Sequence, residues 1–297
     1  MSFTKYLHVE KLGTSETQNI ENGMCYIFPK IDGTNASIWI ESDGLHCGSR
    51  NRELSLDNDN AGFMEWAIKQ ENIIKLLSSN PHLTLYGEWL VPHTLETYEQ
   101  SAWRKFYVFD VYDNITNDFL NYEIYKSMLD YHNIDYIPAI CKIQNPSYEK
   151  LVGLLEKNTF LIEDGKGTGE GIVIKNYDYT NRFGRYACAK LVKNDFKTKH
   201  AKVNDVLELQ EKQSIEDQIV NLCVTKALVD KEYSKIELEK NGWSSKFIPM
   251  LLGIVYYCLI KEEITEMIQK FKNPTIDFRK LNNLTIQKIK QLRPEIF

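Results

Sequence analysis

The sequence predicts an α+β protein built in two parts, and three observations support this fold class. Alternating apolar runs bounded by turn residues recur up to residue 192, with helical patterns between them. After about residue 203 the alternation stops and apolar residues recur at helical spacing. At 297 residues the chain is long enough for two domains. We therefore expect a mixed domain over 1–203 and an all-helical domain over 204–297.

Strands and helices of the first part are predicted from their periodicity. Strands are expected at 26–28, 37–41, 45–47, 83–91, 106–112, 172–175 and 186–192. The second and third of these runs flank Ser42-Asp43-Gly44, which predicts a β-hairpin. Apolar spacing and capping residues predict helices at 63–77, 121–132 and 147–157, then at 204–229, 232–240, 244–271 and 283–291.

Composition limits the classes of function. The net charge of −5 does not indicate a general polyanion binder, yet residues 176–203 hold seven Lys or Arg against two Asp, which predicts a phosphate-facing stripe. No run approaches the length of a membrane span and no signal peptide is recognised, so we expect a cytoplasmic or intracellular protein. The six cysteines lack metal-ligand spacing and are expected to be free thiols.

The segment around Lys30 gives the first chemical indication. An apolar run ending at Pro29 leads into Lys30 and then into the turn Asp32-Gly33-Thr34-Asn35. Glycine and asparagine tolerate positive φ and let a backbone approach a ligand closely. A lysine in such a place can act as a nucleophile when it is neutral. By itself, however, the pattern more often marks a solvated lysine before a turn.

Six polar motifs follow one another along the first part of the chain. Each places charged or polar residues at the end of an apolar strand or inside it. They are Lys30-Ile-Asp-Gly-Thr-Asn35, Ser49-Arg50-Asn51, Tyr86-Gly87-Glu88, Phe106-Tyr-Val-Phe-Asp110, Glu170-Gly-Ile-Val-Ile-Lys175 and Ala189-Lys190-Leu-Val-Lys193. One such motif usually marks a strand end, whereas six in succession indicate one polar pocket lined by a sheet.

This series resembles the motifs of the covalent nucleotidyltransferase superfamily, which contains polynucleotide ligases and capping enzymes. The Lys-x-x-Gly-Thr-Asn pattern, the short segment before the lysine and the helical second part resemble the RNA ligase 2 family of ATP-dependent RNA ligases. The resemblance implies a nucleotidyltransferase (ATP-grasp-like adenylyltransferase) domain with antiparallel sheets flanked by helices, followed by the helical domain. It also implies that 3′-OH and 5′-phosphate RNA ends, held in a nicked duplex, are joined through lysyl-AMP and an adenylylated 5′ end.

The same resemblance assigns the catalytic roles. Lys30 would attack the α-phosphate of ATP, and Lys175 and Lys190 would neutralise the charge that develops there. Neighbouring cations would also favour the neutral amine of Lys30. Glu170 would help to hold Mg²⁺ or Mn²⁺, which prefer oxygen ligands.

The remaining assignments concern the nucleotide and the nucleic acid. Glu88 would accept hydrogen bonds from the ribose, Asn35 would orient a phosphate or a metal-bound water, and Phe109 would stack on adenine, with Phe106 as the competing ring. Ile31 and Arg50 complete the nucleotide contacts that we expect. Contacts to the nucleic acid are expected from Arg52, Lys193, Lys197 and Lys199.

Other functions stay open at this point. Asp32 is typical of DNA ligases, where many RNA ligase 2 relatives have histidine, so an ATP-dependent DNA ligase is one alternative. A capping-type guanylyltransferase is a second, and a non-catalytic nucleic-acid-binding relative is a third. Labelling with ATP or GTP separates the first two, and the effect of Lys30→Ala separates an enzyme from a binding protein. We expect a monomer without membrane association.

Overall fold

The structure is a computed structural model that describes residues 3–91, 97–192 and 214–297. The chain divides into two compact units, Met1–Thr198 and Lys199–Phe297. The boundary expected at residue 203 lies outside the described residues. In the described part of the chain, no helix combines the length and the apolar character that crossing a membrane requires.

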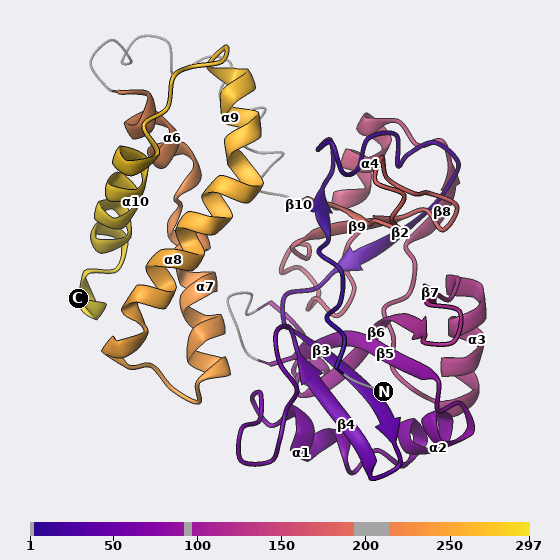
Figure 1. Cartoon of the computed structure of the whole chain (residues 1–297). Helices are drawn as coiled ribbons and strands as arrows, with labels where there is room; N and C mark the ends of the chain where they lie inside the picture. The colour runs from indigo at the N-terminus through magenta and orange to yellow at the C-terminus, as the bar shows by residue number, and fades with distance from the viewer. Residues whose placement is uncertain (1–2, 92–96, 193–213) are drawn as a thin grey trace. The chain divides into compact units, whose positions relative to one another are not determined.

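The first unit contains two five-stranded sheets (Figure 1). The first sheet has the order β1-β10-β9-β2-β8, and its strands are β1 (Glu10–Lys11), β2 (Met24–Lys30), β8 (Cys141–Gln144), β9 (Gly171–Lys175) and β10 (Ala189–Val192). Neighbouring strands are antiparallel except β1, which pairs in parallel with β10.

The second sheet is antiparallel throughout and has the order β4-β3-β5-β6-β7. Its strands are β3 (Thr34–Glu41), β4 (Gly44–Ser49), β5 (Leu83–Leu90), β6 (Lys105–Asp113) and β7 (Asp118–Phe119). The expected hairpin is confirmed as β3–β4, with Ile40 paired with Leu45. The expected α+β class with antiparallel sheets is likewise confirmed.

Four helices flank the two sheets: α1 (Phe63–Ala67), α2 (Glu71–Ser79), α3 (Tyr122–His132) and α4 (Tyr148–Leu155). Figure 1 shows α4 beside the first sheet and the other three around the second. On the first sheet, Ile27, Ile172, Ile174 and Leu191 point toward α4 and form a buried cluster with Leu154. Because side chains alternate along a strand, the residues between them face the opposite side of the sheet.

The second sheet buries an aromatic cluster against α1. Phe63 lies 5.5 Å from Trp89 and 5.1 Å from Phe106, measured between ring centroids, and Trp66 completes the group. Burial of each large apolar side chain contributes about 1.5–3 kcal/mol to the stability of the fold. This cluster therefore determines which face of the sheet is turned toward α1. Glu88, which alternates with Trp89, therefore faces away from it.

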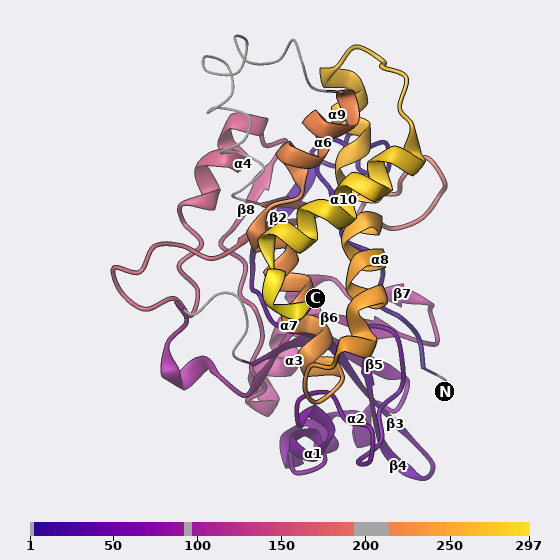
Figure 2. The same ribbon diagram turned by 90° about the vertical axis from the view of Figure 1, so that its left-hand side faces the viewer.

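The second unit is helical (Figure 2). Its described helices are α6 (Ile215–Cys223), α7 (Lys226–Glu239), α8 (Ile248–Cys258), α9 (Ile264–Lys270) and α10 (Phe278–Leu292), with a π-helical turn at Leu259–Glu263. Their shared core includes Ile219, Val229, Leu251, Val255 and Ile289.

Several predicted boundaries were wrong for local reasons. The helix expected at 63–77 is two helices, because Gln70 leaves helical geometry while its side chain donates to the Trp66 carbonyl at 3.1 Å. The helix expected to run through residue 229 is interrupted before Thr225, whose hydroxyl accepts a hydrogen bond from the Leu228 amide and caps a new helix. The short strands β1, β7 and β8 were not predicted. Each has only two to four residues, too few for a periodic pattern.

Candidate active site

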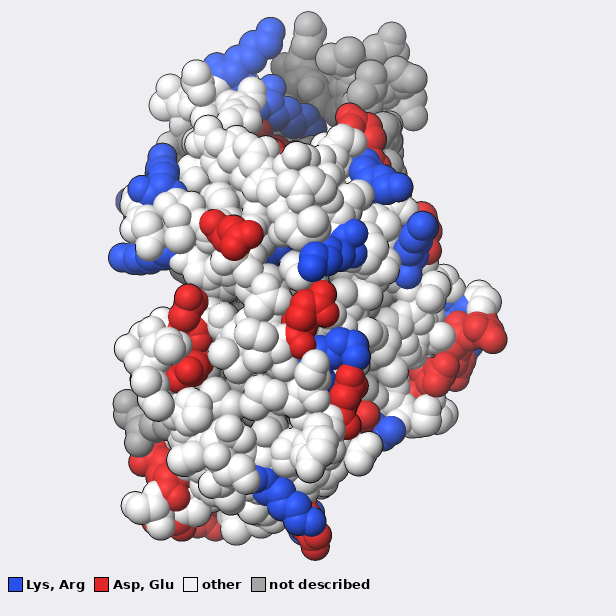
Figure 3. Space-filling view, turned by 90° about the vertical axis from the view of Figure 1, so that its right-hand side faces the viewer, with Lys and Arg blue, Asp and Glu red and all other residues white. Residues whose placement is uncertain are grey.

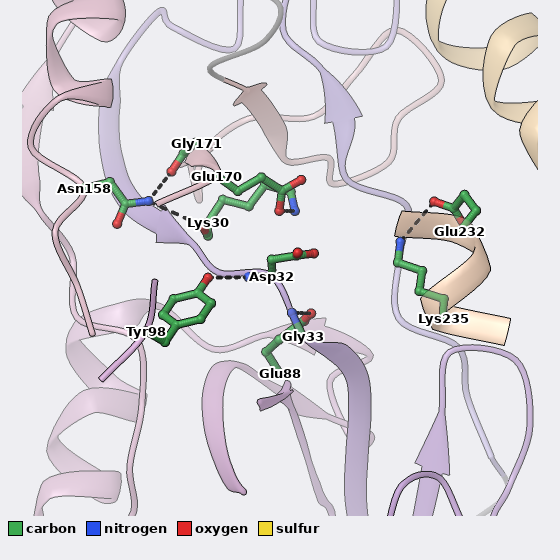
Figure 4. Close-up of polar contacts among 10 residues, drawn as sticks. All are labelled: Lys30, Asp32, Gly33, Glu88, Tyr98, Asn158, Glu170, Gly171, Glu232 and Lys235. Carbon is green, nitrogen blue, oxygen red and sulfur yellow. Dashed lines mark hydrogen bonds and ion pairs between the residues drawn. The ribbon is translucent and has the colours of Figure 1, made fainter. Parts of the chain in front are cut away.

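Lys30 and Glu170 meet where β2 and β9 run side by side. Lys30 is the last residue of β2, and its register partner is Gly171, the first residue of β9. Glu170 precedes Gly171, so its carboxylate reaches Lys30 and forms an ion pair with Nζ (Figure 4). Both side chains remain partly exposed. A candidate nucleophile and a carboxylate that are 140 residues apart in the sequence thus lie side by side, where β2 ends and β9 begins.

The three predicted catalytic lysines share one face of the first sheet. Ile27, Ile172 and Leu191 point into the core beside α4, so Lys30, Lys175 and Lys190 point to the opposite face. Lys190 pairs with Val173, and Val173 pairs with Phe28, which places Lys190 diagonally across the sheet from Lys30. Side-chain alternation therefore forces these lysines onto the same side.

The turn after Lys30 is held by hydrogen bonds to two side chains, those of Tyr98 and Glu88 (Figure 4). The Asp32 amide donates to the Tyr98 hydroxyl at 2.7 Å, and the Gly33 amide donates to Glu88 Oε1 at 3.0 Å. A Cβ on residue 33 would lie 2.6 Å from the Trp89 carbonyl oxygen, so only glycine fits there. Neither Gly33 nor Asn35 has positive φ, so the close approach of the Trp89 backbone, and not a left-handed conformation, is the reason for the glycine.

Tyr98 is a site residue that the sequence did not reveal. It is fully buried, and burial raises its pKa well above the usual range, with further contributions from the nearby charges of Asp32, Glu170 and Glu88. The phenol therefore stays neutral and can serve as a hydrogen-bond acceptor for the turn. A single tyrosine between Thr97 and Glu99 carries no pattern that would have identified it.

Asn158 is a second residue that the sequence did not reveal. Its side-chain amide donates to the Gly171 carbonyl at 2.6 Å and to the Lys30 carbonyl at 3.3 Å (Figure 4). These two bonds join the strand ends that carry the nucleophile candidate and Glu170. The residue lies after α4 in an irregular segment, where sequence patterns give no indication of tertiary contacts.

Lys175 occupies a buried position with partners of its own. Its Nζ lies 2.7 Å from Asp110 Oδ2 and donates to the Phe109 carbonyl at 2.6 Å. Asp110 also accepts a hydrogen bond from the Tyr6 hydroxyl. Burial raises the pKa of Asp110, and the Lys175 ammonium opposes that rise. The structure thus places Lys175 about 13 Å along the strands from Lys30, four residues away, rather than beside it.

The predicted nucleotide-binding residues of the second sheet lie at neighbouring positions. Asn35 and Glu88 are register partners, so their side chains share a face. Arg50 follows Ser49, the partner of Ala36, and its Nη2 lies 3.3 Å from His8 Nδ1. The segment before residue 12 therefore contributes a contact at this end of the sheet.

The two candidate stacking rings are separated by the structure. Phe106 is buried in the aromatic cluster with Phe63, below Gly87, where a Cβ would lie 2.4 Å from the ring. Phe109 is partly exposed, with its ring 4.8 Å from that of Tyr6 and 5.7 Å from Lys175 Nζ. Only Phe109 is accessible to a ligand.

The other predicted contacts fall into three groups. Arg52 donates to the carbonyls of Asn58 at 2.5 Å and Asp59 at 3.1 Å, which fixes its own loop. Ile31 is buried. Lys193, Lys197 and Lys199 lie outside the described residues.

The residues fit a divalent ion that is held mainly by a substrate. Within the described ranges, no three His, Cys, Asp or Glu side chains converge as a metal cage. Mg²⁺ commonly takes one or two protein carboxylates together with phosphate oxygens. Glu170, partly exposed beside Lys30, can supply such a carboxylate.

Comparisons with known proteins agree with this geometry. The family model described as RNA ligase matches residues 25–192. Naegleria gruberi RNA ligase with PPi is 21% identical with a TM-score of 0.52, over 67% of this chain and 58% of that chain. An apo mutant of that enzyme is 20% identical with a TM-score of 0.51, over 67% of this chain and 57% of that chain. A mutant with ATP and Mn is 21% identical with a TM-score of 0.51, over 67% of this chain and 59% of that chain.

These structural matches span less than two thirds of the Naegleria enzyme's length, and at this identity they establish the fold. No match was found among curated proteins.

Proposed function

The chain belongs to the RNA ligase family, and from this premise we propose that it is an ATP-dependent RNA ligase. It joins a 3′-hydroxyl to a 5′-phosphate, with nicks in duplex RNA as the substrate. The observation that carries the proposal is the meeting of Lys30 and Glu170 at the paired ends of β2 and β9, with Lys190 on the same sheet face.

In the first step, Nζ of Lys30 attacks the α-phosphorus of ATP. A phosphoramide bond forms, the α–β phosphoanhydride bond breaks and pyrophosphate leaves. Attack requires a free lone pair on nitrogen, so the proton shared with Glu170 has to leave Nζ first. The fixed turn at Asp32 and Gly33 restrains the backbone after Lys30, and this lowers the entropic cost of reaching the reactive geometry.

The surrounding side chains position the nucleotide. Lys190 neutralises charge on the α-phosphate, Glu88 binds the ribose, Asn35 orients a phosphate or a metal-bound water, and Phe109 stacks on adenine. Lys175 acts through Phe109, because its Nζ is already bound to the Phe109 carbonyl and to Asp110. We therefore assign Lys175 a positioning role in place of the α-phosphate contact expected from the sequence.

Glu170 would be the protein ligand of a divalent ion that arrives with the ATP phosphates. Such an ion neutralises phosphate charge. Glu170 would then hold the ion with the same carboxylate that pairs with Lys30 in the structure. Mn²⁺ accompanies ATP in one Naegleria mutant, which supports this class of ion.

The later steps use the nucleic acid. The 5′-phosphate oxygen attacks the adenylate phosphorus and the bond to Lys30 breaks. The 3′-hydroxyl then attacks the 5′-phosphorus, and AMP leaves. Arg50, which follows the register partner of Ala36, would contact the ribose or the 5′-phosphate, and the lysines at 193, 197 and 199 remain predicted backbone contacts.

Labelling tests the proposal directly. Incubation with α-³²P-ATP and a divalent ion should give covalently labelled protein in denaturing electrophoresis, and Lys30→Ala should remove all label. Lys69→Ala is the matched control, because Lys69 is an exposed lysine paired with Glu65. Label that persists in Lys30→Ala would exclude Lys30 as the nucleophile.

Substrate choice is tested with the same preparation. Nicked RNA duplexes should be sealed faster than nicked DNA duplexes of the same sequence. Label from GTP but not from ATP would favour a capping-type guanylyltransferase, and preferential sealing of DNA would favour a DNA ligase. Nucleic-acid binding without any covalent label would indicate a non-catalytic relative.

A further inference from the structure

Helix α10 concentrates positive charge in a part of the chain whose total charge is balanced. Between Phe278 and Leu292 it carries Arg279, Lys280, Lys288 and Lys290 and no acidic residue, and Arg293 follows directly. Residues 204–297 hold equal numbers of acidic and basic side chains. Among the helices that the structure describes, α10 alone combines several cations with no carboxylate.

The helix orders these side chains on two faces. Leu281, Thr285 and Ile289 are buried at spacings of four and form the core face. Arg279, Asn283, Gln287 and Lys290 are exposed at spacings of three and four, on the opposite face. We call these four residues the α10 stripe. It runs about 16 Å along the helix at 1.5 Å per residue, the length of about five base steps at 3.4 Å each.

The remaining lysines of α10 form polar contacts with α6 of the same unit. Lys280 pairs with Glu216 at 3.1 Å, and Lys288 donates to Asn221 Oδ1 at 2.9 Å. Within the described part of the chain, neither Arg279 nor Lys290 forms an ion pair with a carboxylate. The charges of the stripe are therefore directed to solvent.

Helix α7 shows the ordinary arrangement for comparison. Its lysines alternate with acidic residues, and Lys226 pairs with Asp230 and Lys235 with Glu232, as Figure 4 shows for the second pair. The face of the molecule drawn in Figure 3 likewise has blue and red side chains interspersed among its described residues. Such mixed surfaces do not attract polyanions, so the single-sign stripe is a local exception.

Exposed aromatic rings lie at both ends of the stripe. Phe278, next to Arg279, is 50% exposed, and Phe297 is 45% exposed with its ring centroid 5.4 Å from Lys290 Nζ. Aromatic rings beside cations are the usual means of holding unpaired bases, because every base has a face on which a ring can stack. A membrane surface would instead favour several apolar side chains between the cations.

We propose that the α10 stripe binds the phosphate backbone of the nucleic-acid substrate, with Arg279 and Lys290 as phosphate contacts and Asn283 and Gln287 as hydrogen-bond donors. This proposal rests on the proposed ligase function, and it assigns a substrate-binding surface to a unit beyond the 25–192 match. Phosphate contacts from cations and side-chain amides fix the register of a protein on a duplex without reading its sequence.

Fluorescence anisotropy with a fluorescein-labelled nicked RNA duplex, measured over a series of KCl concentrations, tests the stripe. In the full-length protein, the double variant Arg279→Ala/Lys290→Ala should bind about three- to tenfold more weakly at low salt. The slope of log K against log salt should fall by about 1.4–1.8, because each lost phosphate contact removes about 0.7–0.9. Both side chains are exposed, so the melting temperature should not change.

Two further variants isolate the charge. Arg279→Lys/Lys290→Arg keeps both cations and should keep the salt slope of the unaltered protein. Lys226→Ala/Lys235→Ala removes two lysines of α7 and should change neither the slope nor the affinity. An unchanged slope in Arg279→Ala/Lys290→Ala would overturn the proposal. So would loss of binding to phosphatidylserine vesicles while RNA binding stays intact, because that would identify a membrane surface.

Lysyl-AMP formation separates this proposal from the ligase proposal. The reaction of Lys30 with ATP needs no nucleic acid, so Arg279→Ala/Lys290→Ala should label as fully as the unaltered protein while sealing nicks more slowly at limiting RNA. Absence of label in the unaltered protein would refute the ligase proposal, whereas the anisotropy series decides the stripe by itself.

Discussion

At the scale of single residues, Gly33 shows how one atom decides whether the site forms. Its amide donates to Glu88, and the neighbouring strand comes so close that a methyl group would lie 2.6 Å from the Trp89 carbonyl oxygen. Substitution must therefore push apart the turn after Lys30 and the strand that carries Glu88. The cost of such overpacking is about 1–3 kcal/mol.

Gly33→Ala should lower the free energy of unfolding by that amount and slow lysyl-AMP formation, because the hydrogen bond to Glu88 is lost. Urea unfolding and the rate of α-³²P-AMP labelling measure the two effects. Gly153→Ala is the control, since nothing lies within 4 Å of a Cβ there, in the middle of α4. Alanine in a helix should leave stability unchanged or raise it by up to about 1 kcal/mol. Equal behaviour of the two variants would contradict the close-approach argument.

The buried pair of Lys175 and Asp110 gives a second prediction at this scale. Among the described residues, removal of the cation leaves the buried Asp110 carboxylate with the Tyr6 hydroxyl as its hydrogen-bond donor, and such a loss costs about 3–5 kcal/mol. Lys175→Met should therefore be strongly destabilised in urea. Adding Asp110→Asn removes the uncompensated charge and should restore part of the stability.

The pH dependence of Lys175→Met follows from the pKa of Asp110, which burial raises in the folded protein. A folded-state pKa above the unfolded value means that protonation favours folding. The variant should therefore regain stability as the pH falls toward the folded pKa of Asp110, and lose it again as the pH rises. If the stable double variant formed no lysyl-AMP at saturating ATP, Lys175 would be an α-phosphate contact rather than a positioning residue.

At the scale of elements, Glu216 joins two helices of the second unit. It accepts a hydrogen bond from the Asp277 amide at 3.0 Å, at the start of α10, and pairs with Lys280. Burial alone would raise its pKa, but these hydrogen bonds outweigh burial and lower the pKa to about 2. The contact between α6 and α10 therefore favours the charged form of Glu216 over its protonated form.

Acidification should loosen this junction. Because the folded pKa lies below the ordinary value of 4.5, the stabilisation is complete above that value and is lost as the pH falls toward 2. Glu216→Gln should cost about 2 kcal/mol at neutral pH, the usual worth of hydrogen bonds to a charged group, and should abolish the acid sensitivity. Hydrogen–deuterium exchange of peptides from α6 and α10 between pH 7 and 3 measures both effects. Glu239→Gln, whose partner is the adjacent Lys240, should behave like the unaltered protein.

The elements also show which local signals in the sequence are reliable. Ser147 begins the helix expected at 147–157, and its hydroxyl accepts a hydrogen bond from the Lys150 amide at 3.3 Å at the start of α4. The interruption at Gln70 was not predicted, because the apolar spacing continues through it. Periodicity records which residues are buried, and two short helices can bury the same residues as one long helix.

At the scale of the whole molecule, the two sheets of the first unit supply different halves of one site. The first sheet carries Lys30, Glu170 and Lys190, and the second carries Asn35 and Glu88. The turn after Lys30 connects the two sets, since its amides bond to Glu88 and Tyr98. The fold therefore places the proposed nucleophile beside the residues proposed to bind the nucleotide, without a dedicated metal cage among the described residues.

The sequence by itself determined the α+β class, most strands of the first unit and the helical character of the second, and it singled out Lys30 and Glu170, which form an ion pair, and Glu88, which bonds to the turn after Lys30. These features depend on alternation and on short motifs, which are properties of neighbouring residues. The motif order was sufficient to indicate the ligase family, although each motif alone was weak.

Only the tertiary structure decided which side chains support these residues. Tyr98 and Asn158 act through bonds to the backbone of Asp32, Lys30 and Gly171, and Lys175 turned out to be paired with Asp110. Contacts between residues 66 and 128 positions apart leave no trace in local periodicity. The local sequence indicates which side chains of a segment are buried. The residues that these side chains contact are determined by how the strands pair and by which face of each sheet is covered.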